Sequence, residues 1–589
     1  MVNYYIQRSG VSVIDALLDE AKWQTPTGQT ANITYSFPQV TAYAADDYSE
    51  FDNWWALTSQ EQKMVRQAFK AWSAVANITF TEVNDARTYG DIRVAHTDMG
   101  AGTNGYTYTI NSGTYYIGDP YLTPYPIAGD IWLSNFDAPM VEGNFNYHTV
   151  LHEIGHAIGL KHPFEGGVQL PSWQDNAQYT LMSYDDHPFK TYLNPDETGG
   201  WLERAQPITP MLLDIRAVQY IYGANYDYNA DDTRYEFDDA ADIQTLWDGG
   251  GNDTLDFSAL TDGVNINLAP GAFSSVGYFF DAYARPITAH HNIAIAYSAW
   301  IENVIGSAYN DEIIGNDTSN IINAGAGDDH IWASAGSDYI DGGAGQDVIY
   351  FTGALAEYKN QKISADVIVT DNQLQREGSN QLANIELIRF SNATADLTVN
   401  QTVEGLDSVS VSRIAELYTG FFNRTPEAGG YVYWLNELKK GADLNAIADR
   451  FYDAGIQYGI YEVSQTDSDF VKTLYSNVLG RDESANPPGE QEVQWWLDWL
   501  HQPGQTKGGM ALQMLDDSRA FTDDPVVGWV IDLLDNKAEV ARIFALEFGI
   551  NFDNPETNIA VGQQIAAAIS ADDITTALSL VGISDMPIA

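Results

Sequence analysis

A nine-residue repeat between Gly306 and Tyr350 constrains the fold of this chain more than any other feature of its 589 residues. Five copies follow one another in register, each with Asp or Asn at its sixth position and Ile at its eighth. The polar residues are Asp311, Asn320, Asp329, Asp338 and Asp347, and the isoleucines are Ile313, Ile322, Ile331, Ile340 and Ile349. A flexible Gly/Asp-rich linker carries no such period. The pattern therefore predicts short stacked strands, one in each repeat, whose isoleucines point inward.

The loops between these strands are suited to binding calcium. Glycine permits tight turns that expose backbone carbonyls, and the aspartate adds an anionic oxygen; calcium prefers such oxygen ligands. Successive loops fall on opposite edges of the roll, so one ion would bridge loops eighteen residues apart. The expected pairs are Asp311 with Asp329, Asp329 with Asp347, and Asn320 with Asp338, and the expected glycine ligands are Gly325, Gly327, Gly342 and Gly343. Without calcium the aspartates repel one another, so we expect the roll to fold only with the ion.

The net charge of the chain limits the kinds of molecule that it can bind. With 28 Lys and Arg against 81 Asp and Glu, the formal net charge is −53, which attracts divalent cations. It also repels nucleic acids and anionic membrane surfaces, so we expect no nucleic-acid partner. No stretch approaches the roughly 18 apolar residues that a membrane span requires. The absence of cysteine excludes disulfides, cysteine-ligated zinc and cysteine nucleophiles.

Changes in composition and periodicity divide the chain into four segments. Helical spacing over Thr58–Ala76 and Asn146–Gly159, with short alternating runs between them, predicts an α+β domain at the N-terminus. The segments are 1–222 for this domain, 223–352 for a parallel β-roll, 353–404 for a small β segment that closes the roll, and 405–589 for an all-α region. The chain is therefore expected to be multidomain.

The last segment contains an internal duplication. Leu417-Tyr418, Asn423-Arg424 and Trp434-Leu435 recur as Leu474-Tyr475, Gly480-Arg481 and Trp496-Leu497, which predicts a repeated helical unit. Aromatic stripes usually belong to cores, so Trp434, Trp495, Trp496 and Trp499 are expected to be buried. The alternative is a surface that docks to the cell surface, to a partner or back onto the N-terminal domain.

The second helix of the first segment carries a candidate metal site. His152 and His156 are four positions apart, so both imidazoles lie on one helix face and can share a metal ion. Gly159 permits the left-handed turn that ends the helix, and His162 can then return as a third ligand. Glu153 lies beside the metal, where it can hold a water molecule and accept its proton. Three neutral ligands with a fourth position open to water are typical of a catalytic zinc site.

A methionine turn follows this motif. Thr180-Leu181-Met182-Ser183-Tyr184 is similar to the Met-turn of metzincins. With the histidine motif and the repeats, the first 350 residues or so resemble the serralysins, secreted bacterial metzincins with a C-terminal roll of calcium-binding (RTX) repeats. The resemblance implies endopeptidase activity, one catalytic zinc, Met182 beneath the metal and Tyr184 assisting at the oxyanion. It also implies that substrate lies antiparallel along an edge strand, for which residues 105–110 are the candidate.

The same resemblance implies structural calcium ligands ahead of the repeats. Trp247–Leu255 is similar to the first calcium loop of serralysins, so the expected ligands there are Asp248, Gly250, Gly251 and Asp253. Glu302 matches a family position that shares a calcium with this loop. Thr233 matches a position that offers a backbone carbonyl, although Asn229 and Asp231 replace the usual residues beside it.

These features together predict a secreted zinc endopeptidase, folded by calcium, that hydrolyses extracellular proteins or peptides. The N-terminal residues lack the basic and then apolar pattern of a signal peptide. The resemblance implies export by type I machinery that reads the C-terminus, and Ser584–Ala589 is a poor match to such a signal. One alternative is a calcium-dependent cell-surface or adhesion protein, and another is a narrow-specificity protease that processes a surface-layer protein and is addressed by residues 405–589. The intact Glu153, the three histidines and Tyr184 favour the enzyme.

Overall fold

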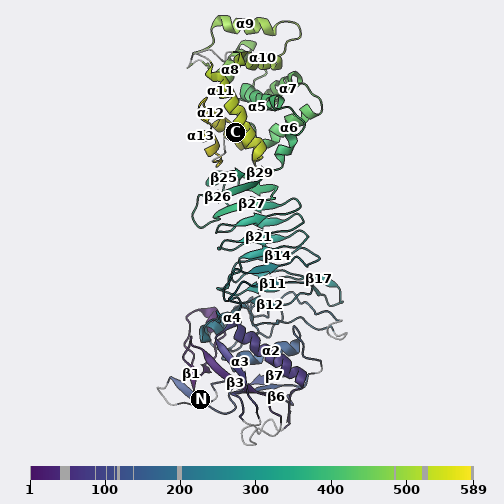
Figure 1. The fold of residues 1–589 in the computed structure, drawn as a ribbon, viewed down its shortest axis with the longest axis vertical. Helices are drawn as coiled ribbons and strands as arrows, with labels where there is room; N and C mark the ends of the chain where they lie inside the picture. Colours follow the sequence, from purple (N-terminus) through teal and green to yellow (C-terminus); the bar gives the residue numbers. More distant parts are fainter. Residues whose placement is uncertain are drawn as a thin grey trace. The chain divides into compact units, whose positions relative to one another are not determined.

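A computed structural model describes the chain except for residues 1, 40–52, 86–87, 101, 112, 116–119, 137, 196–201, 483, 485, 521–527 and 585–589. The chain forms two compact units, Met1–Ala326 and Gly327–Ala589 (Figure 1). The first contains the histidine motif and the beginning of the roll. The second contains the rest of the roll and the helical region.

The N-terminal part of the first unit is α+β, as expected. Its main sheet has the strand order β5-β3-β6-β10-β7, with β4 pairing β6. The strands are β3 (Ala31–Ser36), β4 (Trp54–Trp55), β5 (Ile78–Glu82), β6 (Ile92–Thr97), β7 (Gly105–Thr107) and β10 (Ile131–Leu133). β7 lies at one end of this order and runs antiparallel to β10. A smaller sheet has the order β2-β1-β9-β8, formed by β1 (Asn3–Tyr5), β2 (Ala21–Trp23), β8 (Gly113–Tyr115) and β9 (Tyr121–Pro124).

Helix α2 (Ser59–Val75) confirms the first predicted helix, and its sequence explains its start. Thr58 is the N-cap: its side chain accepts from the Glu61 N–H, and the Glu61 carboxylate accepts from the Thr58 N–H at 2.7 Å. The apolar face is buried, and the Trp72 Nε1–H donates to the Leu151 carbonyl of α3 (Phe145–Ala157) at 3.1 Å. The two predicted helices therefore pack against each other, which fixes the helix that carries the histidines.

The roll in the first unit is built from three-residue strands. β11 (Arg234–Glu236), β13 (Thr254–Asp256), β19 (Asn303–Ile305) and β21 (Ile321–Asn323) are neighbours and run parallel. β14 (Asn265–Asn267) pairs with β20 (Glu312–Ile314) in the same sense. β12 (Gln244–Leu246), β15 (Phe273–Ser274) and β18 (Ile293–Ile295) form a separate small sheet, and β16 (Tyr278–Phe280) and β17 (Pro286–Thr288) form a hairpin.

The second unit continues with strands of the same kind. β22 (His330–Trp332), β24 (Val348–Tyr350) and β28 (Leu387–Arg389) run parallel. β23 (Tyr339–Asp341) pairs with β27 (Ser379–Ala383), which joins β26 (Asp366–Asp371) and β25 (Tyr358–Ile363). The isoleucines at the eighth repeat position occupy the centres of β20 to β24 and are at most 1% exposed. Their inward direction agrees with the period of the sequence.

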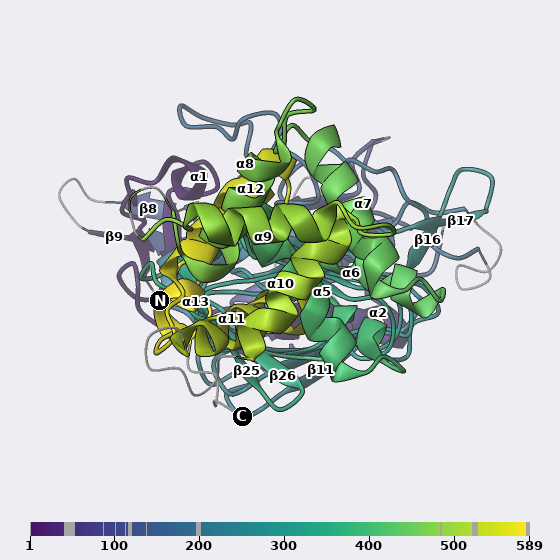
Figure 2. The ribbon, with the colours of Figure 1, turned by 90° about the horizontal axis from the view of Figure 1, so that it is seen from above.

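Residues beyond 405 are helical except for one short strand. The helices are α5 (Ser408–Phe422), α6 (Ala428–Lys439), α7 (Leu444–Gln457), α8 (Asp467–Leu479), α9 (Glu490–Leu500), α10 (Lys507–Arg519), α11 (Trp529–Ala541), α12 (Pro555–Ala568) and α13 (Thr575–Ser579). Helix α5 packs against α6, α7, α8, α10 and α11 (Figure 2). The expected all-α region also contains β30 (Ile550–Phe552), which pairs antiparallel with β29 (Ala393–Asp396). A strand this short carries no readable period, and its partner lies more than 150 residues away.

The residues of the predicted helical duplication make similar local contacts, and the duplication itself stays a prediction. Asn423 ends α5 and Gly480 ends α8, both in the left-handed conformation. The guanidinium of Arg424 lies 4.9 Å from the Tyr418 ring, and that of Arg481 lies 5.2 Å from the Tyr475 ring. Each arginine also pairs with a glutamate, Glu427 in the first copy and Glu492 in the second.

Burial of the tryptophans in this region agrees with expectation only in part. Trp434 and Trp496 are buried, but Trp495 is 54% exposed and Trp499 is half-buried. Trp495 directly precedes Trp496 on α9, and adjacent helical positions face different directions. A single buried face of α9 therefore cannot include both Trp495 and Trp496.

Candidate zinc centre

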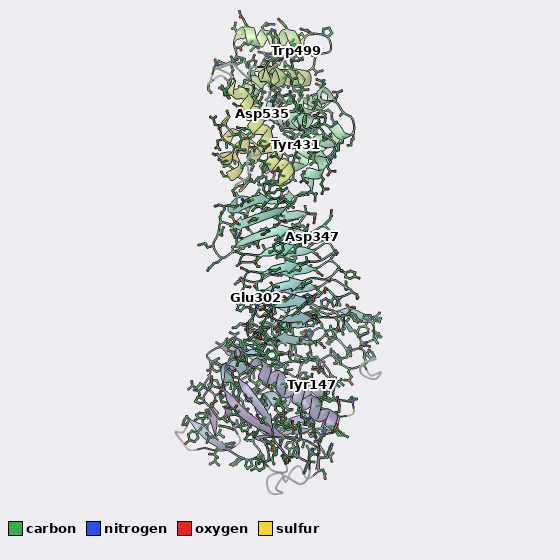
Figure 3. All side chains as sticks on the ribbon, in the orientation of Figure 1. Tyr147, Glu302, Asp347, Tyr431, Trp499 and Asp535 are labelled. Atoms are coloured by element: carbon green, nitrogen blue, oxygen red, sulfur yellow. The ribbon has the colours of Figure 1, made fainter. Side chains whose placement is uncertain are left out.

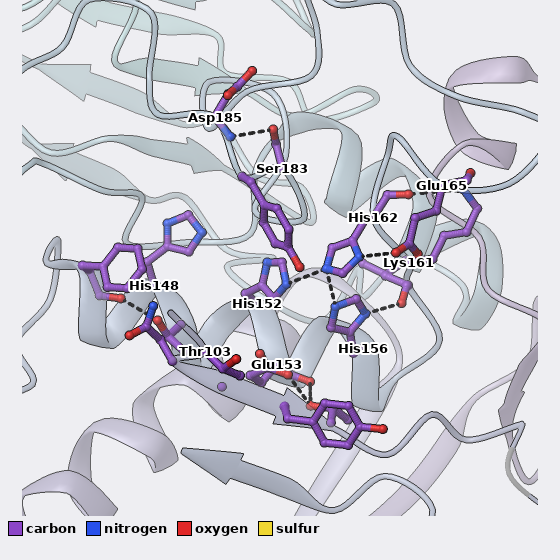
Figure 4. A pocket seen from close by; sticks show the side chains of 18 of the residues that line it. Thr103, His148, His152, Glu153, His156, Lys161, His162, Glu165, Ser183 and Asp185 are labelled. Carbon is purple, nitrogen blue, oxygen red and sulfur yellow. Dashed lines mark hydrogen bonds and ion pairs between the residues drawn. The ribbon is translucent and has the colours of Figure 1, made fainter. Parts of the chain in front are cut away.

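Three imidazoles converge at the end of α3. His152 and His156 lie one turn apart, and His162 returns from the loop beyond Gly159, whose φ is +104°. The Nε2 atom of His162 lies 3.3 Å from that of His152 and 3.1 Å from that of His156 (Figure 4). Among the described residues, these three form the only group of three or more His, Cys, Asp or Glu side chains whose ligand atoms lie close enough together to hold a metal ion.

The Nδ1 atom of each ring is held by an oxygen. His152 Nδ1 lies 2.8 Å from the Leu181 carbonyl, and His156 Nδ1 lies 2.9 Å from the Leu160 carbonyl. His162 Nδ1 lies 2.8 Å from Glu165 Oε1. With each Nδ1–H donating to its oxygen, all three Nε2 lone pairs point to one place, which is the donor set that Zn²⁺ requires.

Burial favours the neutral rings that a metal needs. Burial, with the neighbouring His156, holds the pKa of His152 well below its ordinary value. Burial, with His162 close by, lowers the pKa of His156 to about 4. At neutral pH both rings are therefore unprotonated and free to coordinate a cation.

Glu153 is buried on the β7 side of the helix. Its Oε2 accepts from the Thr107 hydroxyl at 2.6 Å, which fixes the direction of the carboxylate. A Cβ atom at Gly105 would lie 2.6 Å from Glu153 Oε1, so only glycine leaves room for the acid. Burial raises the pKa of Glu153 to about 7, although the Thr107 hydrogen bond acts in the opposite direction. A carboxylate with such a pKa is suited to accept and return a proton near neutral pH.

The methionine turn lies directly under the histidines. Met182 is fully buried, and a Cβ atom at Gly155 would lie 2.6 Å from its sulfur. Gly155 lies between Glu153 and His156 on α3, so the sulfur packs against the helix at the level of the ligands. This contact accounts for a glycine inside the helix, where it otherwise costs about 1 kcal/mol relative to alanine.

Asp214 holds this turn in place. It is wholly buried at the start of α4 (Leu212–Tyr222) and accepts from the Leu181 N–H at 2.6 Å, the Thr180 hydroxyl at 2.5 Å and the Met211 N–H at 3.0 Å. The Leu181 carbonyl in turn orients His152. Asp214 therefore positions a metal ligand through the turn without touching the metal site itself.

We expect Asp214→Ala to lower the free energy of unfolding by about 3 kcal/mol, because it leaves buried donors without acceptors. Zinc should also bind more weakly, since the Leu181 carbonyl loses its anchor. Urea unfolding followed by circular dichroism and competition with a zinc chelator measure the two effects. Asp98→Ala, at an exposed position, is the matched control. Unchanged zinc affinity in Asp214→Ala would contradict the positioning role.

Tyr184 faces the metal site from the Met-turn. Its ring centroid lies 4.6 Å from that of His162 and 6.0 Å from that of His152, and the side chain is 71% exposed. Partial burial and the negative charge of Glu153 raise the pKa of Tyr184. The phenol is therefore protonated at neutral pH and can donate a hydrogen bond.

A cleft of about 540 Å³ opens over these groups. The histidines, Glu153 and Tyr184 form one wall, and β7 with Tyr106 and Thr107 forms another. The expected edge strand, residues 105–110, therefore does lie beside the acid, with β7 as its regular part. An extended polypeptide has room here next to β7, the last strand in the order of its sheet.

Residues of the first expected calcium loop lie close together, and their role as ligands stays a prediction. The Asp253 N–H donates to Glu302 Oε2 at 2.8 Å, and the Gly250 N–H donates to Asp248 Oδ1 at 2.8 Å. A Cβ atom at Gly251 would lie 2.8 Å from Asp253 Oδ1. The Thr233 N–H donates to Asp253 Oδ1, whereas its carbonyl accepts from the Thr254 N–H.

The repeat loops differ from one another. Asp311 accepts from the N–H groups of Val264 and Ser307. The amide of Asn320 donates to the Glu302 carbonyl at 3.0 Å, so it places a neutral donor in its loop. Asp347 Oδ1 accepts from the Asp329 N–H at 2.9 Å, which brings together two residues expected to share an ion.

The remaining expected ligands lie in the second unit or at its boundary. Ser334 Oγ lies 3.4 Å from Asp338 Oδ2, and the Gly327 N–H donates to the Ala344 carbonyl. The glycines Gly325, Gly327 and Gly343 have positive φ, as tight loops require. A Cβ atom at Gly342 would lie 2.7 Å from Asp347 Oδ2. Their role as ligands remains a prediction.

Sequence reasoning missed three residues that support the zinc centre. Thr107 orients Glu153, Asp214 anchors the Met-turn, and Glu165 holds His162. Thr107 and Asp214 are distant in sequence from the groups they hold, so no local pattern marks them. Glu165 lies three residues after His162, and an acid at that spacing was a usable signal.

Comparisons with known proteins agree with this geometry. Residues 32–190 match the Matrixin family model, and residues 212–422 match the model described as Peptidase M10 serralysin C terminal. The chain is 33% identical over 330 residues to a serralysin of Proteus mirabilis, a match covering 50% of this chain and 61% of that protein. It is also 33% identical to the metallopeptidase AprA of Pseudomonas marginalis, over 49% of this chain and 61% of the relative. The metalloprotease AprA of Pseudomonas entomophila (strain L48) is 33% identical over 52% of this chain and 63% of its own length.

The chain thus spans just over three fifths of the length of these relatives. Among the described residues, no helix combines the length and the apolar character needed to cross a membrane. The two family models follow each other along the chain in the order of the histidine domain and the roll. Together with the converging histidines and the buried methionine beneath them, these matches make the chain similar to the serralysin-type metzincins over residues 32–190 and 212–422.

Proposed function

We propose that this protein is a secreted zinc endopeptidase whose roll is folded by calcium. The observation that carries the proposal is the convergence of three Nε2 atoms beside a buried acid at the floor of an open cleft. The residues present fit zinc, because each histidine is held in the orientation that directs Nε2 to the common point. The names of the relatives, serralysin and metalloprotease, support the same reaction class.

When bound, zinc supplies Lewis-acid chemistry, which acidifies water and polarises a carbonyl. Glu153 accepts the proton of the attacking water and returns it to the leaving amine. The Tyr184 hydroxyl donates a hydrogen bond to the oxygen on which negative charge develops. The edge of β7 pairs with the extended substrate and places its scissile bond over Glu153.

Calcium folding and secretion are further parts of the proposal. The chain carries a net charge of −53, and its roll has buried aspartates in a stretch that contains no Lys or Arg between Arg285 and Lys359. Low calcium inside a cell and millimolar calcium outside would keep the roll unfolded before export and fold it afterwards. The expected C-terminal signal lies, apart from Ser584, outside the described residues.

The narrower proposal, a protease addressed to one surface-layer protein, depends on residues 405–589. These residues are mostly helical and carry exposed aromatic side chains such as Trp495 and Trp529. To test whether residues 405–589 direct the protease to the cell surface, we would measure binding to intact cells of the producing bacterium. The wild-type protein is compared with a variant in which both tryptophans are alanine. Equal binding would favour a broad scavenging enzyme.

Metal removal tests the main proposal. We expect the purified chain to contain one zinc, to lose casein hydrolysis when 1,10-phenanthroline is added with calcium kept at millimolar level, and to regain it with stoichiometric zinc. His156→Ala should lose the metal, whereas His501→Ala, whose side chain is 65% exposed, should keep it. A zinc-loaded chain that hydrolyses no protein substrate would refute the proposed activity.

A further inference from the structure

Two places in the roll share one arrangement of an aspartate and a glutamate. In the first unit, Asp253 directly precedes β13 and Glu302 directly precedes β19, and the two strands are parallel neighbours with Thr254 opposite Asn303. The acids therefore face each other in register. The Asp253 N–H donates to Glu302 Oε2 at 2.8 Å.

The second unit repeats this arrangement with residues outside the expected ligand set. Asp347, labelled in Figure 3, directly precedes β24, and Glu386 directly precedes β28. These strands are parallel neighbours with Val348 opposite Leu387. The Asp347 N–H donates to Glu386 Oε2, again at 2.8 Å. A buried isoleucine comes before each glutamate, Ile301 in the first place and Ile385 in the second.

Each of the two aspartates also has one carboxylate oxygen that accepts no hydrogen bond from the described residues. Asp253 and Asp347 are both 0% exposed. Oδ1 of Asp253 accepts from the Thr233 N–H at 2.7 Å, and Oδ1 of Asp347 accepts from the Asp329 N–H at 2.9 Å. Oδ2 of each is buried with no hydrogen-bond partner among the described residues. A buried carboxylate oxygen without a partner is costly, so a ligand is expected at both places.

The surroundings of Asp347 favour a cation as that ligand. Glu386, Asp328 and Asp341 place negative charge around the buried carboxylate of Asp347. The backbone is close as well, since a Cβ atom at Gly342 would lie 2.7 Å from Asp347 Oδ2 and 2.3 Å from the Asn384 carbonyl oxygen. No Lys or Arg occurs between Arg285 and Lys359 to neutralise the site from the repeats.

We infer that Glu386 is a calcium ligand that, with Asp347, forms a site at the end of the roll equivalent to the one at Asp253 and Glu302. One oxygen of Glu386 accepts from the Asp347 N–H, and the carboxylate has a second oxygen for the ion. A donor set of carboxylates and backbone carbonyls on flexible loops suits calcium better than the smaller magnesium ion. The inference rests on the proposed calcium folding and adds to it a ligand from beyond the repeats.

Calcium binding by the full-length protein tests the inference. We expect Glu386→Gln to bind one calcium fewer than wild type in equilibrium dialysis, or to bind it at least about tenfold more weakly. Glutamine keeps an oxygen that accepts from the Asp347 N–H, so the hydrogen bond survives and the charge is removed. Glu404→Gln, an exposed glutamate of the same unit, should bind as wild type does. Glu302→Gln should lose a calcium in the same way.

Two further measurements distinguish the loss of a calcium ligand from poor folding and from a failure of the proposed function. Glu386→Asp retains the charge on a shorter side chain, so an intermediate affinity is expected even if the glutamine variant folds poorly. At saturating calcium, zinc content and casein hydrolysis should match wild type, because Glu386 lies outside the catalytic cleft. Equal calcium stoichiometry and affinity in Glu386→Gln and wild type would overturn the inference. A wild-type chain that binds no calcium would overturn the proposed calcium folding as well, whatever its protease activity.

Discussion

Replacing Glu153 with glutamine should lower casein hydrolysis by about 10²–10⁴-fold while zinc content stays unchanged. Glutamine has nearly the same shape, so it fits beside Gly105 and still accepts from the Thr107 hydroxyl. What it loses is the ability to accept the proton of the attacking water. The expected loss is therefore in kcat with little change in KM, which steady-state hydrolysis of a fluorogenic peptide measures.

The control for this experiment is Glu236→Gln, which removes a carboxylate whose side chain is 79% exposed in β11. Its activity should equal that of wild type. Metal analysis of both variants shows whether the catalytic site is still loaded. Activity in Glu153→Gln equal to that of wild type, with zinc bound, would refute the role of Glu153 as general base and would favour the adhesion alternative.

Removing calcium should unfold the roll. Each calcium site contributes about 2.7 kcal/mol of folding stability when free calcium is 100 times its dissociation constant, and that contribution vanishes in EGTA. The roll strands are three residues long, and the aspartates between them repel each other, so little else holds the strands together. We expect a large loss of β-sheet circular dichroism and a lower unfolding temperature, both restored by added calcium.

The control is the same EGTA treatment followed by excess magnesium, which should restore little of the signal because its ligand shell is smaller and more rigid. Zinc content has to be followed in parallel, since a chelator that also removes zinc would confuse the two metals. A roll that keeps its circular dichroism and unfolding temperature in EGTA would contradict calcium folding.

The sequence was most informative where chemistry depends on spacing within one element. His152 and His156 share a helix face, Gly159 permits the turn, and the period of nine brings every repeat isoleucine inside. It was least informative for contacts between distant segments. Thr107 reaches Glu153 across 46 residues, and Glu386 meets Asp347 across 39, so neither pair leaves a local pattern.

The sequence was also limited in predicting which side chains of the helical region are buried. The Tyr/Arg/Trp pattern marks residues whose Arg–Tyr contacts are similar in the two segments, and the repeated unit stays a prediction. It could not separate Trp495 from Trp496, since neighbouring positions on one helix differ in direction and only the packing of α9 decides which is covered. The strand β30 was missed because three residues cannot display a period.

Strand β30 has a mechanical consequence. The chain leaves the sheet after β29, forms helices α5 to α11, and returns at β30, which is the next strand along the chain. These helices are therefore an insertion between two neighbouring strands of one sheet. A domain attached to a sheet by one linker can rotate about that linker, whereas a domain attached at both of its ends resists rotation. Because β29 and β30 are antiparallel, both attachments lie at the same end of the pair, so a force pulling on these helices would load the hydrogen bond from the Asp396 N–H to the Gly549 carbonyl first.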